Sequence, residues 1–170
     1  DAGHGGEELG AKGFNGVLEK DINLSICKLL NEDIKNLNKL EVINTRINDI
    51  KMDLSDRVKL CSFLGGDLFA FDNEKVNGIE TYYYLKEPHS KELCNYVQEN
   101  LIHETEAYDR GVKTSNFVVL RENMVPSILI ECGFITNEVE CNKLIDEEYQ
   151  RRISKAIADG VNKFLKLKNI

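Results

Sequence analysis

The first residues that could do chemistry stand in the opening segment DAGHGG, residues 1–6. This segment places His4 among glycines, directly after what we expect to be the end of a strand. Glycine lets the backbone turn sharply and leaves the imidazole uncovered, and imidazole is the commonest protein ligand for metal ions. A single histidine in a loop is more often a solvated side chain, so this interpretation requires partner residues.

A candidate partner is Glu19, which stands in LEKD at the start of a predicted helix. One interpretation is an acid in the first turn that interacts favourably with the helix dipole. The other is a carboxylate ligand that projects back toward His4. The spacing between the two residues does not separate these interpretations.

The third candidate is Glu131, which lies in SILIECGF, inside the most apolar predicted strand. Burying a carboxylate without a partner is costly, so Glu131 needs a partner, a proton or a role. At the end of a strand and before Gly133 it could face a cleft, where desolvation would raise its pKa toward the range of a general base. The alternative is a structural carboxylate held in a polar network. Strand alternation turns Cys132 to the opposite face, where we expect a core residue.

The elements that must position these residues alternate between helices and strands. This alternation predicts one α/β domain whose sheet is covered by helices on both faces. Only two prolines occur, and neither a repeat nor a domain boundary is evident. The predicted helices cover 19–37, 53–64, 89–102, 137–145 and 147–166, and the predicted strands cover 40–46, 67–71, 79–85, 117–120 and 127–132, after a loop over 1–17.

The composition excludes several classes of protein. The net charge of −7 argues against nucleic acid as a partner, because phosphate binding needs clustered lysines and arginines. No apolar run is as long as a membrane span. The five cysteines are odd in number and form no CxxC pair, which argues against a disulfide framework and against a cysteine-rich structural zinc site.

Taken in order along the chain, several segments resemble one family. Over residues 1 to 166 the chain resembles the zinc-dependent N-acetylmuramoyl-L-alanine amidases in the order and sequence of seven segments. In chain order these segments are DAGHGG, LEKDINLSICKLL, NTR, SDRVKL, NGIETYYYL, DRGVKTSNFVVLR and ILIECGFITNEVE. Agreement over this many segments is far more specific than a single short motif.

The resemblance implies a function and a role for each candidate. His4 and Glu19 would be ligands of Zn²⁺, and Glu131 would be the catalytic acid/base. The substrate would be peptidoglycan, cut between the lactyl group of muramic acid and L-alanine, in the cell wall or another extracytoplasmic location. The implied fold is a mixed, mostly parallel sheet of about six strands with flanking helices. The sequence does not distinguish an autolysin, a spore-cortex enzyme and a phage lysin.

The chain departs from the family at the third zinc ligand, a histidine in a SIHxN segment. Residues 66–69 match the strand before that segment, but residues 70–73 follow at once and contain no histidine. About six residues are therefore missing between Phe69 and Ala70. Because deleting part of a central strand would cost several kcal/mol, we expect that this segment is omitted from the sequence rather than lost from the protein.

The family's first strand is also missing before Asp1, so we expect residues 1–170 to be an amidase catalytic domain within a longer chain. If the ligand segment is truly absent, zinc keeps two obvious protein ligands instead of the usual three. His89 and His103 are expected to be exposed near the ends of a helix. The alternative function is then a non-catalytic cell-wall-binding or regulatory domain, or an amidase activated by a partner protein.

Overall fold

The computed structural model describes residues 1–37, 40–64 and 77–168, with the side chains of 61–64 left aside. Three strands form one mixed sheet in the order β2–β1–β3. The central strand β1 (Ile79–Tyr83) pairs in parallel with β2 (Asp109–Thr114) and antiparallel with β3 (Leu129–Glu131). The predicted α/β class is therefore confirmed, and the described sheet is mixed.

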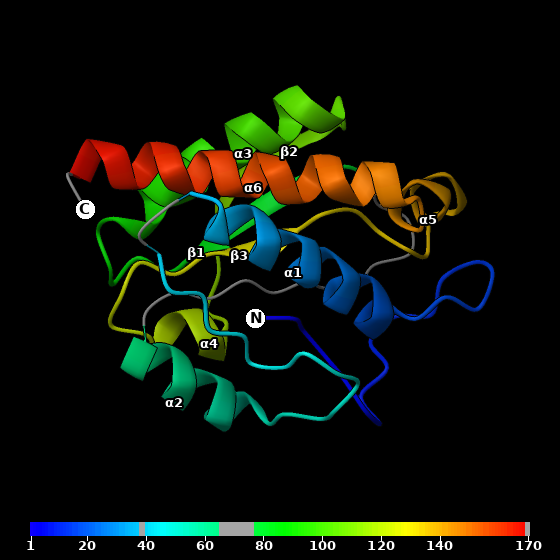
Figure 1. The fold of residues 1–170 in the computed structure, drawn as a ribbon, viewed down its shortest axis with the longest axis horizontal. Coiled ribbons are helices and arrows are strands. Elements are labelled where there is room, and N and C mark those ends of the chain that lie inside the picture. The colour runs from blue at the N-terminus through cyan, green and yellow to red at the C-terminus, as the bar shows by residue number, and fades with distance from the viewer. Residues whose placement is uncertain (38–39, 65–76, 169–170) are drawn as a thin grey trace.

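Helices lie on both sides of this sheet (Figure 1). The helices are α1 (Glu19–Lys35), α2 (Leu54–Leu64), α3 (Ser90–Thr105), α4 (Val118–Arg121), α5 (Glu138–Leu144) and α6 (Glu147–Lys168). In Figure 1, α3, α6 and α1 lie on one side of β1 and β3, and α2 and α4 lie on the other. None of the helices in the described ranges is both long enough and apolar enough to span a membrane.

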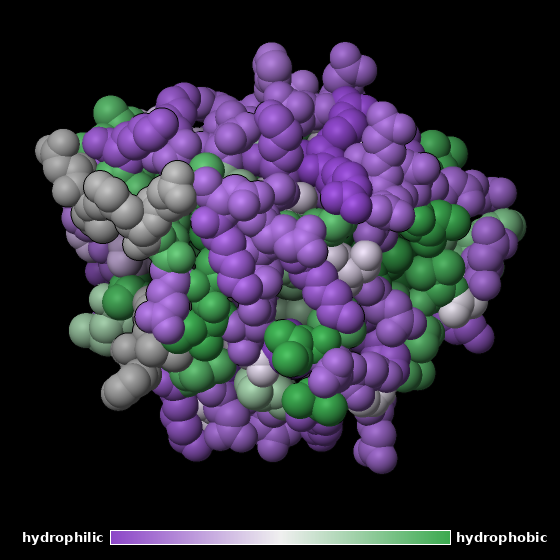
Figure 2. All heavy atoms as spheres, in the orientation of Figure 1, coloured by the Kyte–Doolittle hydropathy of each residue, from purple (hydrophilic) through white to green (hydrophobic). Residues whose placement is uncertain are grey.

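The apolar faces of these helices build two hydrophobic clusters. The larger cluster joins α1, α3 and α6 to the sheet, and in α1 it takes Ile22, Ile26 and Leu30, which share one helix face. The smaller cluster packs Val119, Leu120 and Leu129 against partners that include Val58 of α2. Leu129 and Glu131 are two residues apart on β3, so their side chains point to the same side of the strand. The smaller cluster covers this side. Figure 2 shows that the outer surface in this view is mostly hydrophilic.

The expectation of six strands is not met within the described residues, which hold three. Residues 40–46 form no strand; instead the side chains of Thr45 and Arg46 bond to residues 1–3. The segment 117–120 was expected as a strand because it is short and rich in valine, but it begins the helical turn α4, since short apolar runs do not reveal their period.

Two further differences concern the sheet. The edge strand β2 was not predicted, because DRGVKT has one large apolar residue, Val112, and no alternation to detect. The predicted strand 67–71, and with it the junction between Phe69 and Ala70, lies outside the described residues.

Candidate active site

His4 and Glu19, 15 positions apart in the printed sequence, meet in the folded chain. The His4 Nε2 atom lies 3.3 Å from Glu19 Oε1. The histidine comes from the loop at the start of the chain, and Glu19 is the first residue of α1. The glutamate side chain is 6% exposed and the histidine side chain 33%, so a buried carboxylate supports a partly open imidazole.

The Glu19 carboxylate is held in a fixed orientation. Its Oε2 atom accepts a hydrogen bond of 2.7 Å from the Ala11 backbone N–H. Within the described part of the chain, Oε1 has no hydrogen-bond partner beyond the contact with His4. A buried carboxylate oxygen directed at an imidazole is available to a third species, such as a cation.

The loop around His4 has an unusual backbone. His4 itself has φ = 59°, in the left-handed region that non-glycine residues rarely adopt. Gly5 (φ 136°) and Gly6 (φ 58°) follow, and a Cβ atom on Gly5 would lie 2.2 Å from the Ile50 carbonyl oxygen. Gly5 and Gly6 of DAGHGG are therefore required both by conformation and by close packing against the segment before α2. Strain of this kind costs about 1–3 kcal/mol and persists only where the surroundings enforce it.

Two buried arginines enforce this conformation. Arg46 donates from Nε to the Ala2 carbonyl (2.8 Å) and from Nη2 to the Gly3 carbonyl (2.9 Å). Arg57, on α2, donates from Nη1 to the same Ala2 carbonyl (2.8 Å) and from Nη2 to the His4 carbonyl (2.8 Å). Arg57 also pairs with Asp1 at 2.5 Å. Between them, the two arginines bind three carbonyls of the histidine loop, those of Ala2, Gly3 and His4.

A lysine and an aspartate hold the next residue of the loop. Lys20 Nζ donates to the Gly6 carbonyl at 3.0 Å and to Asp49 Oδ2 at 2.5 Å. Asp49 Oδ1 in turn accepts the Gly6 backbone N–H at 2.7 Å. The hydrogen bond from Lys20, followed by that from Gly6, lowers the pKa of Asp49, so its carboxylate is ionised at neutral pH.

The electrostatics of the pair favour a protonated imidazole when no metal is bound. The hydrogen bond with Glu19 raises the pKa of His4 above its ordinary value, and it outweighs burial, which acts in the opposite direction. The Glu19 charge also raises this pKa, whereas the nearby Arg57 lowers it. A site that attracts a proton this way attracts other cations as well.

The geometry of the pair fits two ligands of a zinc ion. Zinc bonds of about 2.0–2.2 Å in a tetrahedral arrangement place neighbouring ligand atoms roughly 3.3 Å apart, and His4 Nε2 and Glu19 Oε1 are separated by 3.3 Å. The buried Oε1 atom described above is oriented for such a bond. Among the described residues, no group of three or more histidine, cysteine or acidic side chains converges on one point. His4 and Glu19 therefore fit two of the ligand positions around a zinc ion, and the described residues do not supply a third protein ligand.

Glu131 ends strand β3 and is 1% exposed. It lies directly opposite Glu80 of β1 in the antiparallel register. The side of β3 that carries Leu129 and Glu131 faces α2, the helix whose Arg57 binds the His4 loop. The convergence of Glu131 with His4 and Glu19 stays a prediction.

The charge of Glu80 is compensated locally. Its carboxylate accepts hydrogen bonds from Tyr82 Oη (2.5 Å), Arg110 Nε (2.6 Å) and the Lys113 ammonium. Burial raises the pKa of Glu80, but these three donors together outweigh burial and leave the pKa below its ordinary value. The Glu80 carboxylate is thus favoured in its ionised form, and no pattern in the sequence pointed to it as part of the site.

The remaining candidates lie elsewhere. His89 precedes α3 and His103 lies in its last turn, where its side chain is 83% exposed, as expected. Cys132 packs against the larger hydrophobic cluster, and burial raises the pKa of its thiol, which confirms a core residue rather than a nucleophile. Sequence reasoning missed the contacts of Lys20 and Asp49, because no local pattern indicates a pair formed across 29 positions.

Together, the fold and the site define a single α/β domain in which an N-terminal histidine meets a buried carboxylate at the start of α1. A family model described as N-acetylmuramoyl-L-alanine amidase matches residues 1–163. The chain therefore belongs to the N-acetylmuramoyl-L-alanine amidase family, whose members hydrolyse the amide bond between muramic acid and L-alanine in peptidoglycan. The family, the enzyme class and the reaction expected from the sequence are confirmed.

Individual relatives agree with this assignment. The chain is 38% identical over 168 residues to N-acetylmuramoyl-L-alanine amidase LytC of Bacillus subtilis, covering 94% of this chain and 34% of LytC. It is similar to the crystal structure of N-acetylmuramoyl-L-alanine amidase from Clostridium difficile 630, with a TM-score of 0.94, 36% identity and coverage of 99% of this chain and 95% of that one. It is also similar to the CwlD amidase from Clostridioides difficile, solved in complex with the GerS lipoprotein, with a TM-score of 0.88, 36% identity and coverage of 98% and 96%.

Proposed function

We propose that residues 1–170 form a zinc-dependent amidase domain that removes the stem peptide from peptidoglycan outside the cytoplasmic membrane. The observation that carries this proposal is the approach of His4 Nε2 to within 3.3 Å of the buried Glu19 Oε1. A histidine and a carboxylate at that distance are suited to one divalent ion, and zinc uses both ligand types in catalytic sites.

Each residue has a defined role in this proposal. His4 and Glu19 hold zinc, which when bound supplies Lewis acidity for the scissile carbonyl and a lowered pKa for water. Glu131 accepts a proton from the attacking water and delivers it to the amine of L-alanine as that amine leaves. The burial of Glu131 at the end of β3 supports this role, because a desolvated carboxylate binds a proton more readily than a solvated one.

The test combines a muropeptide digestion assay with metal analysis of the purified protein. Glu131→Gln is expected to lower the rate by about 100-fold or more while leaving the zinc content near that of the wild type. His4→Ala is expected to lose both zinc and activity. Glu122→Gln serves as a control, because Glu122 is exposed and pairs with the neighbouring Arg121. Retained activity in Glu131→Gln would reject the role given to Glu131.

A second candidate function rests on the number of ligands. The chain has three histidines, and two of them flank or end α3 rather than join His4. A pair of ligands supports a non-catalytic cell-wall-binding or regulatory domain, or an amidase that needs an activating partner. The similar CwlD amidase was solved in complex with another protein, the GerS lipoprotein. Binding to insoluble peptidoglycan with no zinc uptake and no release of stem peptide would favour the non-catalytic role. Activity that appears only with a partner would favour the other.

A further inference from the structure

Every backbone carbonyl from Ala2 to Gly6 accepts a hydrogen bond in the folded chain. Arg46 and Arg57 bind the first three carbonyls, the Glu8 N–H binds the Gly5 carbonyl at 3.1 Å, and Lys20 binds the Gly6 carbonyl. The histidine loop is therefore held throughout its length by protein groups, without any ion. The strained φ of His4 is maintained by these contacts.

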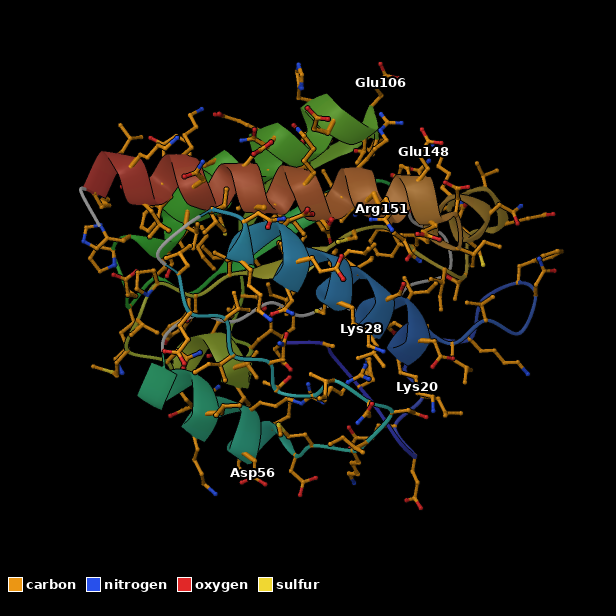
Figure 3. All side chains as sticks on the ribbon, viewed as in Figure 1. Lys20, Lys28, Asp56, Glu106, Glu148 and Arg151 are labelled. Atoms are coloured by element: carbon orange, nitrogen blue, oxygen red, sulfur yellow. The ribbon has the colours of Figure 1, made fainter. Side chains whose placement is uncertain are left out.

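Lys20 differs from the arginines because it follows Glu19 directly. Its backbone belongs to the first turn of α1, and its ammonium reaches Gly6, two residues beyond His4. The lysine thus ties the loop that carries one proposed ligand to the helix that carries the other. Figure 3 shows Lys20 at the end of α1 nearest the loop.

Asp49 completes this connection from a third segment. It binds Lys20 and the Gly6 N–H with its two oxygens, so Lys20, Asp49 and Gly6 form a closed ring of hydrogen bonds. The Lys20 side chain is 9% exposed, and a cation buried to that extent needs its counter-ion. The Asp49 side chain is 47% exposed, so Asp49 can be changed without opening the hydrophobic core.

We propose that Asp49 is a positioning residue for the metal site: through Lys20 and Gly6 it fixes the separation of His4 from Glu19. Asp49 does not contact the ion and acts only through the two ligands. This inference rests on the proposed zinc-dependent function. Outer groups that orient metal ligands typically change metal affinity by about 10- to 100-fold when they are removed.

The experiment compares Asp49→Ala with a matched control, Asp56→Ala. Both aspartates are largely exposed and pair with a lysine, at 47% and 56% side-chain exposure. Within the described ranges, Asp56 forms its ion pair with Lys59 of its own helix, and no hydrogen bond joins its side chain to the histidine loop. Figure 3 shows it on α2, at the edge of the view and away from α1. Zinc affinity is measured by competition with a chromophoric chelator, and Tm by circular dichroism.

Asp49→Ala is expected to weaken zinc binding by about 10- to 100-fold and to lower the Tm, because the buried Lys20 ammonium loses its counter-ion. Asp56→Ala is expected to keep the Tm of the wild type and a zinc affinity within about twofold of it. Equal zinc affinity in the two variants would overturn the proposal. Zinc affinity is measured well below the Tm of each variant, so that a loss of affinity reports on the folded protein.

A metal-free measurement separates this proposal from the proposed function. Amide hydrogen exchange at Gly6 is expected to be faster in Asp49→Ala than in the wild type, because its acceptor is removed, and unchanged in Asp56→Ala. If the wild type takes up no zinc, the zinc-dependent function fails, while this exchange comparison still decides whether Asp49 orders the loop. Unchanged exchange at Gly6 would refute the role of Asp49.

Discussion

Replacing Gly10 by alanine tests how tightly the proposed ligand pair is packed. A Cβ atom at position 10 would lie 2.6 Å from Glu19 Oε2 and 2.8 Å from both Glu19 Cβ and His4 Cδ2. Both side chains would have to move, and the hydrogen bond between Ala11 N and Glu19 Oε2 would be distorted. Overpacking of this kind costs about 1–3 kcal/mol, in addition to the strain of a left-handed alanine.

Gly16→Ala is the matched control for the strain. Gly16 has φ = 78° and Gly10 has φ = 67°, so the backbone cost of alanine, about 1–2 kcal/mol, is similar at both positions. A Cβ atom on Gly16 would meet only Lys12 Cε, at 3.9 Å. The difference between the two variants therefore isolates the collision with His4 and Glu19, at about 1–3 kcal/mol.

Thermal unfolding and zinc titration measure the two consequences. Each kcal/mol corresponds to about 2–4 °C in Tm for a domain of this size, so Gly10→Ala should melt several degrees below Gly16→Ala. Its zinc affinity should fall by about 10- to 100-fold, while Gly16→Ala keeps the affinity of the wild type. Equal Tm values and equal zinc affinities in the two variants would refute the close packing argued for this site.

Two further predictions concern the surroundings of the site. The pKa of Glu80 is lowered in the folded state, so the ionised Glu80 carboxylate stabilises the fold fully above about pH 4.5. This stabilisation is lost as the pH falls through the folded-state pKa. The Tm difference between the wild type and Glu80→Gln should thus be large at about pH 7 and smaller at about pH 3, and a difference that does not change with pH would contradict this. The Asn137 side chain caps α5 by accepting hydrogen bonds from the backbone N–H groups of Val139 and Glu140. Asn137→Ala should therefore lower the free energy of unfolding by about 1 kcal/mol, measured by thermal unfolding. The control is Asn142→Ala, at an exposed position of the same helix, which should leave the free energy of unfolding unchanged.

The long amphipathic helices were predictable because their apolar period is local information. The helix predicted over 19–37 corresponds to α1, and the one over 147–166 corresponds to α6. The edge strand β2 was not predictable in this way, because its neighbours in the sheet, rather than its own residues, make it a strand.

The site was predictable in part. The structure places the Glu19 carboxylate beside His4, and their roles as ligands stay predictions. The support given by Arg46, Arg57 and Asp49 was not foreseen, because each of these residues reaches the loop across more than 40 positions. Contacts of that span depend on how the whole chain folds and leave no periodic signal in the sequence.

The large sequence separation between the histidine loop and the residues that bind it also determines when the site can form during folding. The two arginines that bind the carbonyls of residues 2–4 lie 43 to 55 positions further along the chain, and the ion pair between Asp1 and Arg57 spans 56. Closing loops of that length comes late compared with helix formation, which is local and fast. A nascent or partly unfolded chain therefore has α1 and its glutamate before it has an ordered histidine loop. We therefore expect His4 and Glu19 to come together only after the segments around Arg46 and Arg57 have docked against the N-terminal loop.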